Sequence, residues 1–465
     1  MPDTALQTAD DTLTALTAFT WSPRPEPAQF VQRLLKECFA QSPFAASLSE
    51  RMHVKTGTRL LDWIDHFGLP ENDPALQELD AVGYTRADKC GVVAFEHREG
   101  LFPRIRIHHG LARQLAIKVE SVADFLAANE LGVEIEGPPL ASVRVASLAY
   151  DGSVEILAVE RHGSLAFDPN PHEQVPLAAI LRQTESLRLR RRNFASDDDG
   201  FIHAIQLIEE TIVDVGRDRA CEIFFGAERE YWLRRNTAGR MQKARQDLLG
   251  LGWANHDHHT YRSSRANFSL LIAFLERLGF QCRERFYAGM EAGWGAQVIE
   301  HPVTGVTIFA DVDMSPEEVS QDFSHDGLRP RDQLGTVGLW CALHGEAFLQ
   351  AGMHHLECQF DFAATRDQLK QAGIETMPPF TDLPHLRQAF TRGEQWDVDP
   401  VRVERLRSAG QITDEQARKF LQNGALGSHL EILQREDGYK GFNQKGISEI
   451  IAATDPRRAA AHADG

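Results

Sequence analysis

Apolar positions in the C-terminal half of the chain predict a strand–helix–strands unit that occurs twice. In the first copy, apolar residues after 263 recur at helical spacing, and Gly279 ends the predicted helix. One helical face carries Phe268, Leu271, Ile272, Leu275 and Leu278. Strand-like segments then pass through Phe286 and over residues 296–300 and 306–312. This order predicts a βαβββ unit.

The second copy follows His355. A strand over 358–362 precedes a helix that ends at Gly373. The distance from His355 to Gly373 is similar to the distance from His258 to Gly279 in the first copy. A polar, helical insertion over 382–423 then separates this helix from the last strand, which carries Glu431. The similarity of the two copies indicates an internal duplication.

The N-terminal half repeats the pattern in a weaker form. A β-branched strand over 115–119 precedes a predicted helix over 122–131. Two alternating strands over 142–150 and 153–160 flank an Asp-Gly pair, which is a strong hairpin signal. We therefore expect βαβββ units here as well.

A change in composition separates the two halves. The basic run Leu187-Arg188-Leu189-Arg190-Arg191-Arg192 is followed by the acidic run Asp197-Asp198-Asp199-Gly200. Basic and acidic runs side by side in an acidic protein are typical of a solvated linker rather than a nucleic-acid patch.

The predicted class is α+β, with paired βαβββ units forming open barrels. Its parts are an N-terminal tail and helix (1–45), a non-catalytic domain of βαβββ units (46–185), a helical linker (186–250), a catalytic metal-binding domain (251–455) and a disordered tail (456–465).

Bulk properties narrow the possible functions. The 465 residues carry a formal net charge of -18, which argues against general binding to nucleic acid or anionic membranes. No apolar run reaches the length of about 18 residues that a transmembrane helix needs, and the N-terminus does not resemble a signal peptide. The six cysteines are scattered, so we expect reduced thiols and a cytoplasmic protein. A homo-oligomer is compatible with these data.

Three short segments contain the residues from which a metal site can be built. They are Asn255-His256-Asp257-His258-His259-Thr260, Gly352-Met353-His354-His355-Leu356-Glu357 and Ser428-His429-Leu430-Glu431-Ile432. Two imidazoles and one carboxylate on one face of a metal leave the opposite positions free for a chelating substrate and O2. We predict that one histidine from each of the first two segments, together with Glu431, binds Fe(II), with Mn(II) as an alternative.

Strand alternation restricts which histidines can meet. His256 and His258 share one strand face, whereas His259 faces away. His354 and His355 face opposite sides, so we expect only one of them to enter a shared cavity. For each of these residues the competing interpretation is an ordinary structural or exposed histidine.

The segments resemble the vicinal oxygen chelate superfamily and, within it, the 4-hydroxyphenylpyruvate dioxygenases. Asp257-His258 is similar to the family's first ligand pair, and Gly352-Met353-His354-His355 to its Gly-x-x-His segment. The most specific match is Leu430-Glu431-Ile432-Leu433-Gln434-Arg435, followed by Gly441-Phe442-Asn443, which is similar to the glutamate strand and lid. The likeness covers about residues 251–455, and residues 50–180 only in pattern.

A more distant likeness is to 2-oxoadipate dioxygenase/decarboxylase, whose His-x-Thr-Pro-Arg segment is similar to His258-His259-Thr260-Tyr261-Arg262. That family takes its other histidine from the preceding unit, which makes His53 a rival to His355. The Gly-x-x-His context favours His355. Both resemblances imply that a 2-oxo acid chelates Fe(II) and is oxidatively decarboxylated with O2. The alternatives are a metal-dependent lyase or isomerase, a ring-cleaving dioxygenase, and a non-catalytic binding protein.

Four further residues are candidates around the cavity. We expect Gln297 to face it from a strand. Arg262 could pair with a substrate carboxylate or lie on the surface at a helix start. Phe442 and Asn443 belong to a predicted lid over 438–451, whose glycines permit hinge conformations, although a plain turn is the alternative.

Overall fold

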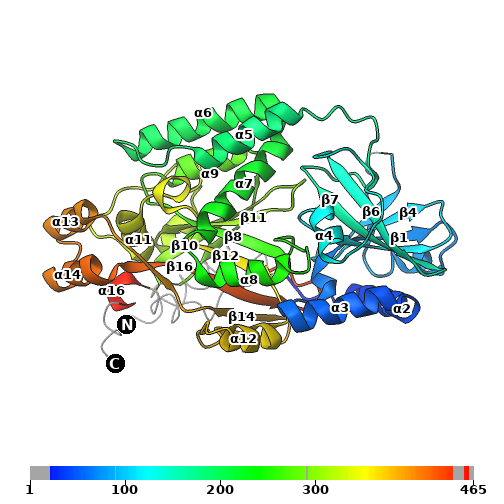
Figure 1. The fold of residues 1–465 in the computed structure, drawn as a ribbon. Helices are drawn as coiled ribbons and strands as arrows, with labels where there is room; N and C mark the ends of the chain where they lie inside the picture. Colours follow the sequence, from blue (N-terminus) through cyan, green and yellow to red (C-terminus); the bar gives the residue numbers. More distant parts are fainter. Residues whose placement is uncertain (1–20, 89–90, 290–291, 444–454, 460–465) are drawn as a thin grey trace.

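A computed structural model describes residues 21–88, 91–289, 292–443 and 455–459 (Figure 1). It contains a seven-stranded sheet in the N-terminal half and a nine-stranded sheet in the C-terminal half. The strands at the two ends of each sheet do not pair with one another in the described residues, so neither sheet closes into a barrel. The protein is therefore a mixed α+β molecule with two open sheets.

The N-terminal sheet has the strand order β2-β3-β4-β1-β5-β7-β6. The predicted strands over 115–119, 142–150 and 153–160 correspond to β5, β6 and β7. Only two strands follow α4, so the βαβββ order is incomplete there. The elements of this half are α2 (Pro25–Gln41), α3 (Pro43–Thr56), β1 (Ile64–Pro70), β2 (Thr85–Arg86), β3 (Ala94–Glu96), β4 (Arg104–His108), β5 (Arg113–Lys118), α4 (Val122–Ala128), β6 (Val143–Tyr150) and β7 (Val154–Arg161), with short helical turns at Leu60–Trp63 and Pro74–Glu78.

Four helices connect the two sheets: α5 (Leu177–Leu189), α6 (Asp197–Val215), α7 (Arg217–Leu233) and α8 (Thr237–Asp247). α7 packs against α5 and α6 and lies between them and the strands in Figure 1. The basic run, whose first part belongs to α5, is solvated only in part: Arg188 and Arg191 are exposed, whereas Arg190 is buried. Arg190 and Arg192 both contact the fully buried carboxylate of Glu228 on α7, because the chain folds back over that helix.

The C-terminal sheet has the order β13-β14-β16-β12-β8-β11-β10-β9, and β15 pairs with β16. A strand, a helix and three strands follow one another from β8 to β11. The elements are β8 (His256–Arg262), α9 (Phe268–Arg277), β9 (Gln281–Tyr287), β10 (Trp294–Glu300), β11 (Thr307–Asp313), α10 (Pro316–Val319), α11 (Thr336–His344), a short helical turn (Ala347–Ala351), β12 (His355–Gln359), α12 (Phe362–Gln371), β13 (Thr381–Leu383), β14 (Leu386–Phe390), β15 (Glu394–Trp396), α13 (Pro400–Ser408), α14 (Asp414–Asn423), β16 (Ala425–Arg435) and α16 (Pro456–Ala459).

Two predictions for this half need correction. The segment 382–423 is not a purely helical insertion, because β14 and β15 within it pair with β16 and extend the sheet. The predicted disordered tail over 456–465 begins with the short helix α16, where Arg457 pairs with Asp455. The remainder of that tail, like residues 1–20 of the predicted N-terminal tail, lies outside the described residues.

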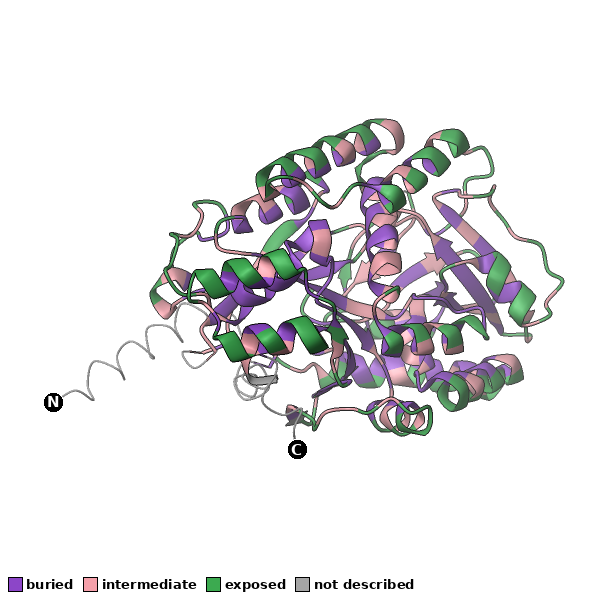
Figure 2. Cartoon of the chain, turned by 60° about the vertical axis from the view of Figure 1, so that its left-hand side comes forward, coloured by how far each residue is buried: buried purple, intermediate pink, exposed green. Residues whose placement is uncertain are grey.

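Buried residues gather on the strands, and the connecting and peripheral helices expose their outer faces (Figure 2). α9 packs the apolar face predicted from its spacing into the larger core, with Leu271, Ile272 and Leu275 fully buried. Among the described residues, we find no helix with both the length and the apolar character needed to cross a membrane.

The buried contact between Glu228 and two arginines makes a testable contribution to stability. Replacing Glu228 with Ala leaves Arg190 and Arg192 without a counter-charge, so we expect the free energy of unfolding to fall by about 3–5 kcal/mol. Glu230→Ala, which removes an exposed ion pair on the same helix, should change it by less than about 1 kcal/mol. Urea unfolding of both variants measures the difference, and equal effects would contradict this account.

His162, the residue that follows strand β7, should make the stability of the protein depend on pH. His162 contacts Glu160 and Glu222 at 2.8 Å each, which ties β7 to α7. Burial lowers its pKa, but the hydrogen bonds to both glutamates outweigh this effect and raise the pKa to about 9. The contribution of these contacts to the free energy of unfolding is fully present below about pH 6.5, the pKa of histidine in the unfolded chain. It is lost as the pH rises through 9. The destabilisation caused by His162→Gln should therefore be large at pH 6 and small at pH 10.

Candidate metal centre

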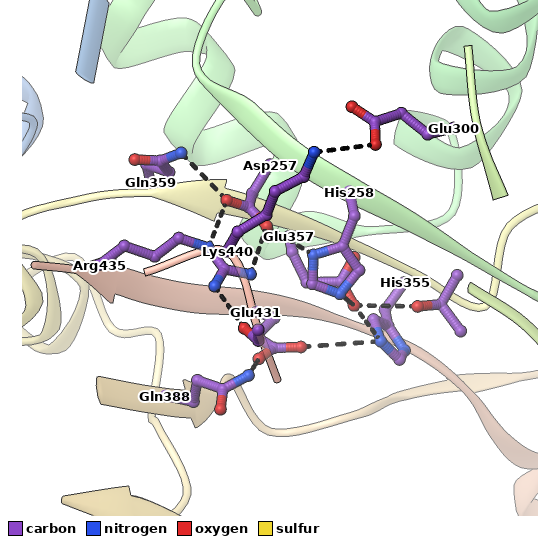
Figure 3. A network of polar contacts seen from close by, with 12 residues as sticks. Asp257, His258, Glu300, His355, Glu357, Gln359, Gln388, Glu431, Arg435 and Lys440 are labelled. Carbon is purple, nitrogen blue, oxygen red and sulfur yellow. Dashed lines mark hydrogen bonds and ion pairs between the residues drawn. The ribbon is translucent and has the colours of Figure 1, made fainter. Parts of the chain in front are cut away.

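The candidate site lies on the three central strands of the nine-stranded sheet. β12 pairs antiparallel with β8 and parallel with β16. This register sets Glu357 opposite His258 on one side and opposite Glu431 on the other. His355 lies two residues before Glu357, on the same face of β12. The pairing thus brings four polar side chains together (Figure 3).

The ligand atoms of these side chains surround one point. The Nε2 atoms of His258 and His355 both contact Oε1 of Glu357, at 3.0 Å for His258. Oε2 of Glu431 lies 3.7 Å from Nε2 of His355. One ligand atom from each of His258, Glu357 and Glu431 lies within 4.8 Å of the others. Two ligand atoms that bind the same ion at ~2.0–2.2 Å lie ~3–4 Å from each other, and these separations are close to that distance.

The protonation states of the four groups suit a divalent cation. Burial lowers the pKa of His258, and lowers that of His355 well below its ordinary value, so both imidazoles are neutral and can donate a lone pair. Burial raises the pKa of Glu431 to about 7. Burial and the neighbouring charge of Glu431 raise the pKa of Glu357 well above its usual range. The carboxyl pair therefore retains a proton that a bound cation would release.

Asp257 orients His258. Its Oδ1 lies 2.8 Å from Nδ1 of His258, Arg435 donates to both carboxylate oxygens at 2.8 and 3.0 Å, and Gln359 donates at 3.0 Å. Burial raises the pKa of Asp257, but the charge of Arg435 and the hydrogen bond from His258 lower it well below the ordinary value. A carboxylate that accepts the Nδ1 proton leaves the Nε2 lone pair of His258 free, and metal binding needs that tautomer.

A small cavity of about 70 Å³ adjoins the four side chains. Two basic side chains on its wall, Arg262 and His429, are buried. Within the described residues, Nε and Nη1 of Arg262 and both ring nitrogens of His429 have no hydrogen-bond partner. Asp311 lies 3.8 Å from Nε of Arg262, which still leaves the guanidinium without a hydrogen-bond partner at two nitrogens. Burial lowers the pKa of His429 to about 3, so its neutral ring can donate one hydrogen bond. These buried donors suit an anionic ligand, because donors without partners are costly. The rest of the wall is mainly aromatic: Phe286, Trp294, Phe309, Phe380, Phe390 and Phe442.

Three other predicted residues also line this cavity. Arg262 is buried, so it is not the surface residue of the alternative interpretation. The ring of Phe442 lies 5.0 Å from that of His258, and Asn443 donates to a backbone carbonyl at 3.2 Å. The predicted lid continues over 444–451, which lie outside the described residues.

Gln297 does not line the cavity, so the prediction that it faces the site is corrected. Its amide nitrogen donates to the backbone oxygen of Glu284 at 3.0 Å, and its amide oxygen accepts from Ser324 at 2.9 Å. The neighbouring Ala296 and Val298 pair with residues of β11 that line the cavity. Strand alternation therefore turns Gln297 to the opposite face.

The competing histidines lie in different places. His256 lines a separate, larger cavity between the two halves of the molecule, and His259 packs into the core on the other face of β8. His354 lines the same cavity as His355, with their Nδ1 atoms 2.5 Å apart, contrary to the prediction that only one of them could enter. The reason is that β12 begins at His355, so strand alternation does not apply to His354. The rival His53 is half exposed on α3, and the structure does not bring it to this site.

Sequence reasoning missed three residues of the site. Glu357 and His429 lie two positions from His355 and Glu431, so the period of a strand could have identified both. Gln388 on β14 donates to Oε1 of Glu431 at 2.7 Å. No local signal marks Gln388, because its segment reads as part of a polar insertion.

Comparisons with known proteins leave the family undecided. No family model and no curated protein matches the chain. A mutant of 4-hydroxymandelate synthase from Streptomyces coelicolor matches over 86% of this chain and 98% of that one, with 11% identity and a TM-score of 0.28. Methylmalonyl-CoA epimerase from Mycobacterium tuberculosis matches over 39% of this chain and 88% of its own, with 12% identity and a TM-score of 0.23. A protein of Shewanella frigidimarina, named only provisionally as a hydrolase, matches over 47% and 95%, with 17% identity and a TM-score of 0.32. With TM-scores this low, the functional argument depends on the site itself.

The contact between Asp257 and His258 can be tested by a substitution that keeps the shape of the side chain. In Asp257→Asn, the carboxamide can donate a hydrogen bond to Nδ1, which favours the tautomer with a proton on Nε2. We expect affinity for Fe(II) or Mn(II) to fall by about 10–100-fold while the protein stays folded. Isothermal titration with circular dichroism measures both quantities, and Asp247→Asn on the exposed face of α8 is the control. Unchanged affinity in Asp257→Asn would contradict the orienting role.

Proposed function

We propose that this protein is an Fe(II)-dependent oxygenase that binds a small 2-oxo acid by chelation and decarboxylates it oxidatively. The observation that carries the proposal is a set of contacts beside a cavity. His258 lies within 4.8 Å of Glu431, and the neutral imidazole of His355 lies 3.7 Å from the same carboxylate. Fe(II) held by these groups would supply open positions for a chelating substrate and O2. Mn(II) fits the same donors.

The volume and the lining of the cavity favour a small, anionic substrate. Its free space of about 70 Å³ has room for the carboxylate and keto end of an acid and few further atoms. The guanidinium of Arg262 and one N–H of the neutral His429 ring line the cavity and can donate to a carboxylate. The aromatic wall, including Phe442, would exclude water from the bound substrate.

A second candidate is a metal-dependent lyase or isomerase that does not use O2. The additional carboxylate of Glu357 favours it, since a carboxylate beside a chelated substrate can accept or donate a proton. Measurement of O2 uptake separates the two candidates.

The test is a panel of 2-oxo acids added to the Fe(II)-loaded protein in an oxygen electrode, with CO2 release measured in parallel. We expect at least one acid to produce equal amounts of O2 uptake and CO2 release. His258→Ala and Glu431→Ala should abolish both, because each removes a ligand. Arg262→Met should raise KM by about 10–100-fold, since the loss of a charged hydrogen bond costs about 1.5–3 kcal/mol.

His53→Ala is the matched control, because it removes a histidine outside the site and should leave the activity unchanged. Loss of activity in His53→Ala with retention in His355→Ala would reverse the ligand assignment. Conversion of a 2-oxo acid without O2 would favour the second candidate.

A further inference from the structure

Glu357 occupies the middle of the row of polar residues across the three central strands. Its Cα pairs with that of His258 on β8 and with that of Glu431 on β16. Adjacent strands lie about 4.8 Å apart, and a protein ligand binds a divalent ion at ~2.0–2.2 Å. An ion shared by His258 and Glu431 must therefore lie above the strand between them, over Glu357.

The side chain of Glu357 points to that position. Its Oε1 contacts Nε2 of both His258 and His355 and accepts a hydrogen bond from Thr260 at 2.9 Å. For His258, Nε2 is the atom that the tautomer set by Asp257 directs toward a metal. The same oxygen therefore lies within reach of any ion that the two histidines share, as Figure 3 shows.

The charges around Glu357 provide a second, independent argument. Among the described residues, the ion-pair partners of Glu357 and Glu431 within 4.0 Å are all histidines. Arg435 forms its ion pair with Asp257. Two adjacent buried carboxylates without a cation are expensive, and a divalent ion bound to both would neutralise them.

We propose that Glu357 is a fourth protein ligand of the metal in the substrate-free protein, together with His258, His355 and Glu431. This inference rests on the metal site of the proposed function and specifies its ligand number. Of the six positions of an octahedral ion, four protein ligands leave two, and a chelating 2-oxo acid fills both. An oxygenase would need one more open position for O2, which three protein ligands would provide.

The number of water molecules on bound Mn(II) tests the proposal in the unmodified protein. Water-proton relaxation of the Mn(II)-loaded protein should give two bound waters if Glu357 is a ligand. Three bound waters would overturn the proposal. Failure of the wild-type protein to bind Mn(II) would overturn the proposed metal site as well, so the two failures are distinguishable.

Variants distinguish whether Glu357 binds the metal or only positions the residues that do. Glu357→Gln should lower Mn(II) affinity by at least about tenfold and raise the number of bound waters from two to three. If Glu357 only positions its neighbours, the wild-type protein should already have three bound waters and the variant should keep three, which would contradict ligation. Glu346→Gln is the matched control, because Glu346 is also buried in the same half and bonds to Ser263 and Ser264 rather than to the residues of the site. It should leave both values unchanged.

Discussion

The pairing of β12 with both β8 and β16 is the constraint on which the rest of the site depends. Antiparallel pairing on one side and parallel pairing on the other align His258, Glu357 and Glu431 in one row. A shift of one residue in either register would turn a whole strand's polar residues to the opposite face. The apolar residues that alternate with them, such as Leu356 and Leu430, pack into the core and oppose such a shift.

Buried charge in this molecule falls into two kinds. Some charged groups have partners that account for them, as Asp257 and Arg435 do for each other. These pairs hold neighbouring elements in place and leave little capacity for a ligand. Around the cavity, by contrast, donors and carboxylates are buried with incomplete partners. Since such groups are costly to fold, they are the strongest physical indication of a site for an ion and an anion.

The other parts of the chain hold β16 in position. Trp232, at the end of α7, donates to the hydroxyl of Ser428 on β16 at 2.7 Å. From the N-terminal half, Arg59 donates to the backbone oxygen of Arg435 at 3.0 Å and pairs with Glu436. The helical layer and the N-terminal half thus contact the strand that carries Glu431 from different directions. This explains physically why a small site is built on so long a chain.

The sequence by itself determined the local elements and the candidate ligands. Helical and strand periods identified α9, α12 and the strands around them, because those periods depend only on neighbouring residues. The motifs, through their resemblance to a known family, singled out His258, His355 and Glu431. Only the tertiary structure decided which faces meet: it added Glu357 to the row, turned Gln297 away, buried Arg190 and placed β14 beside β16. Register and pairing between strands depend on segments far apart in the chain, so a local pattern does not by itself determine them.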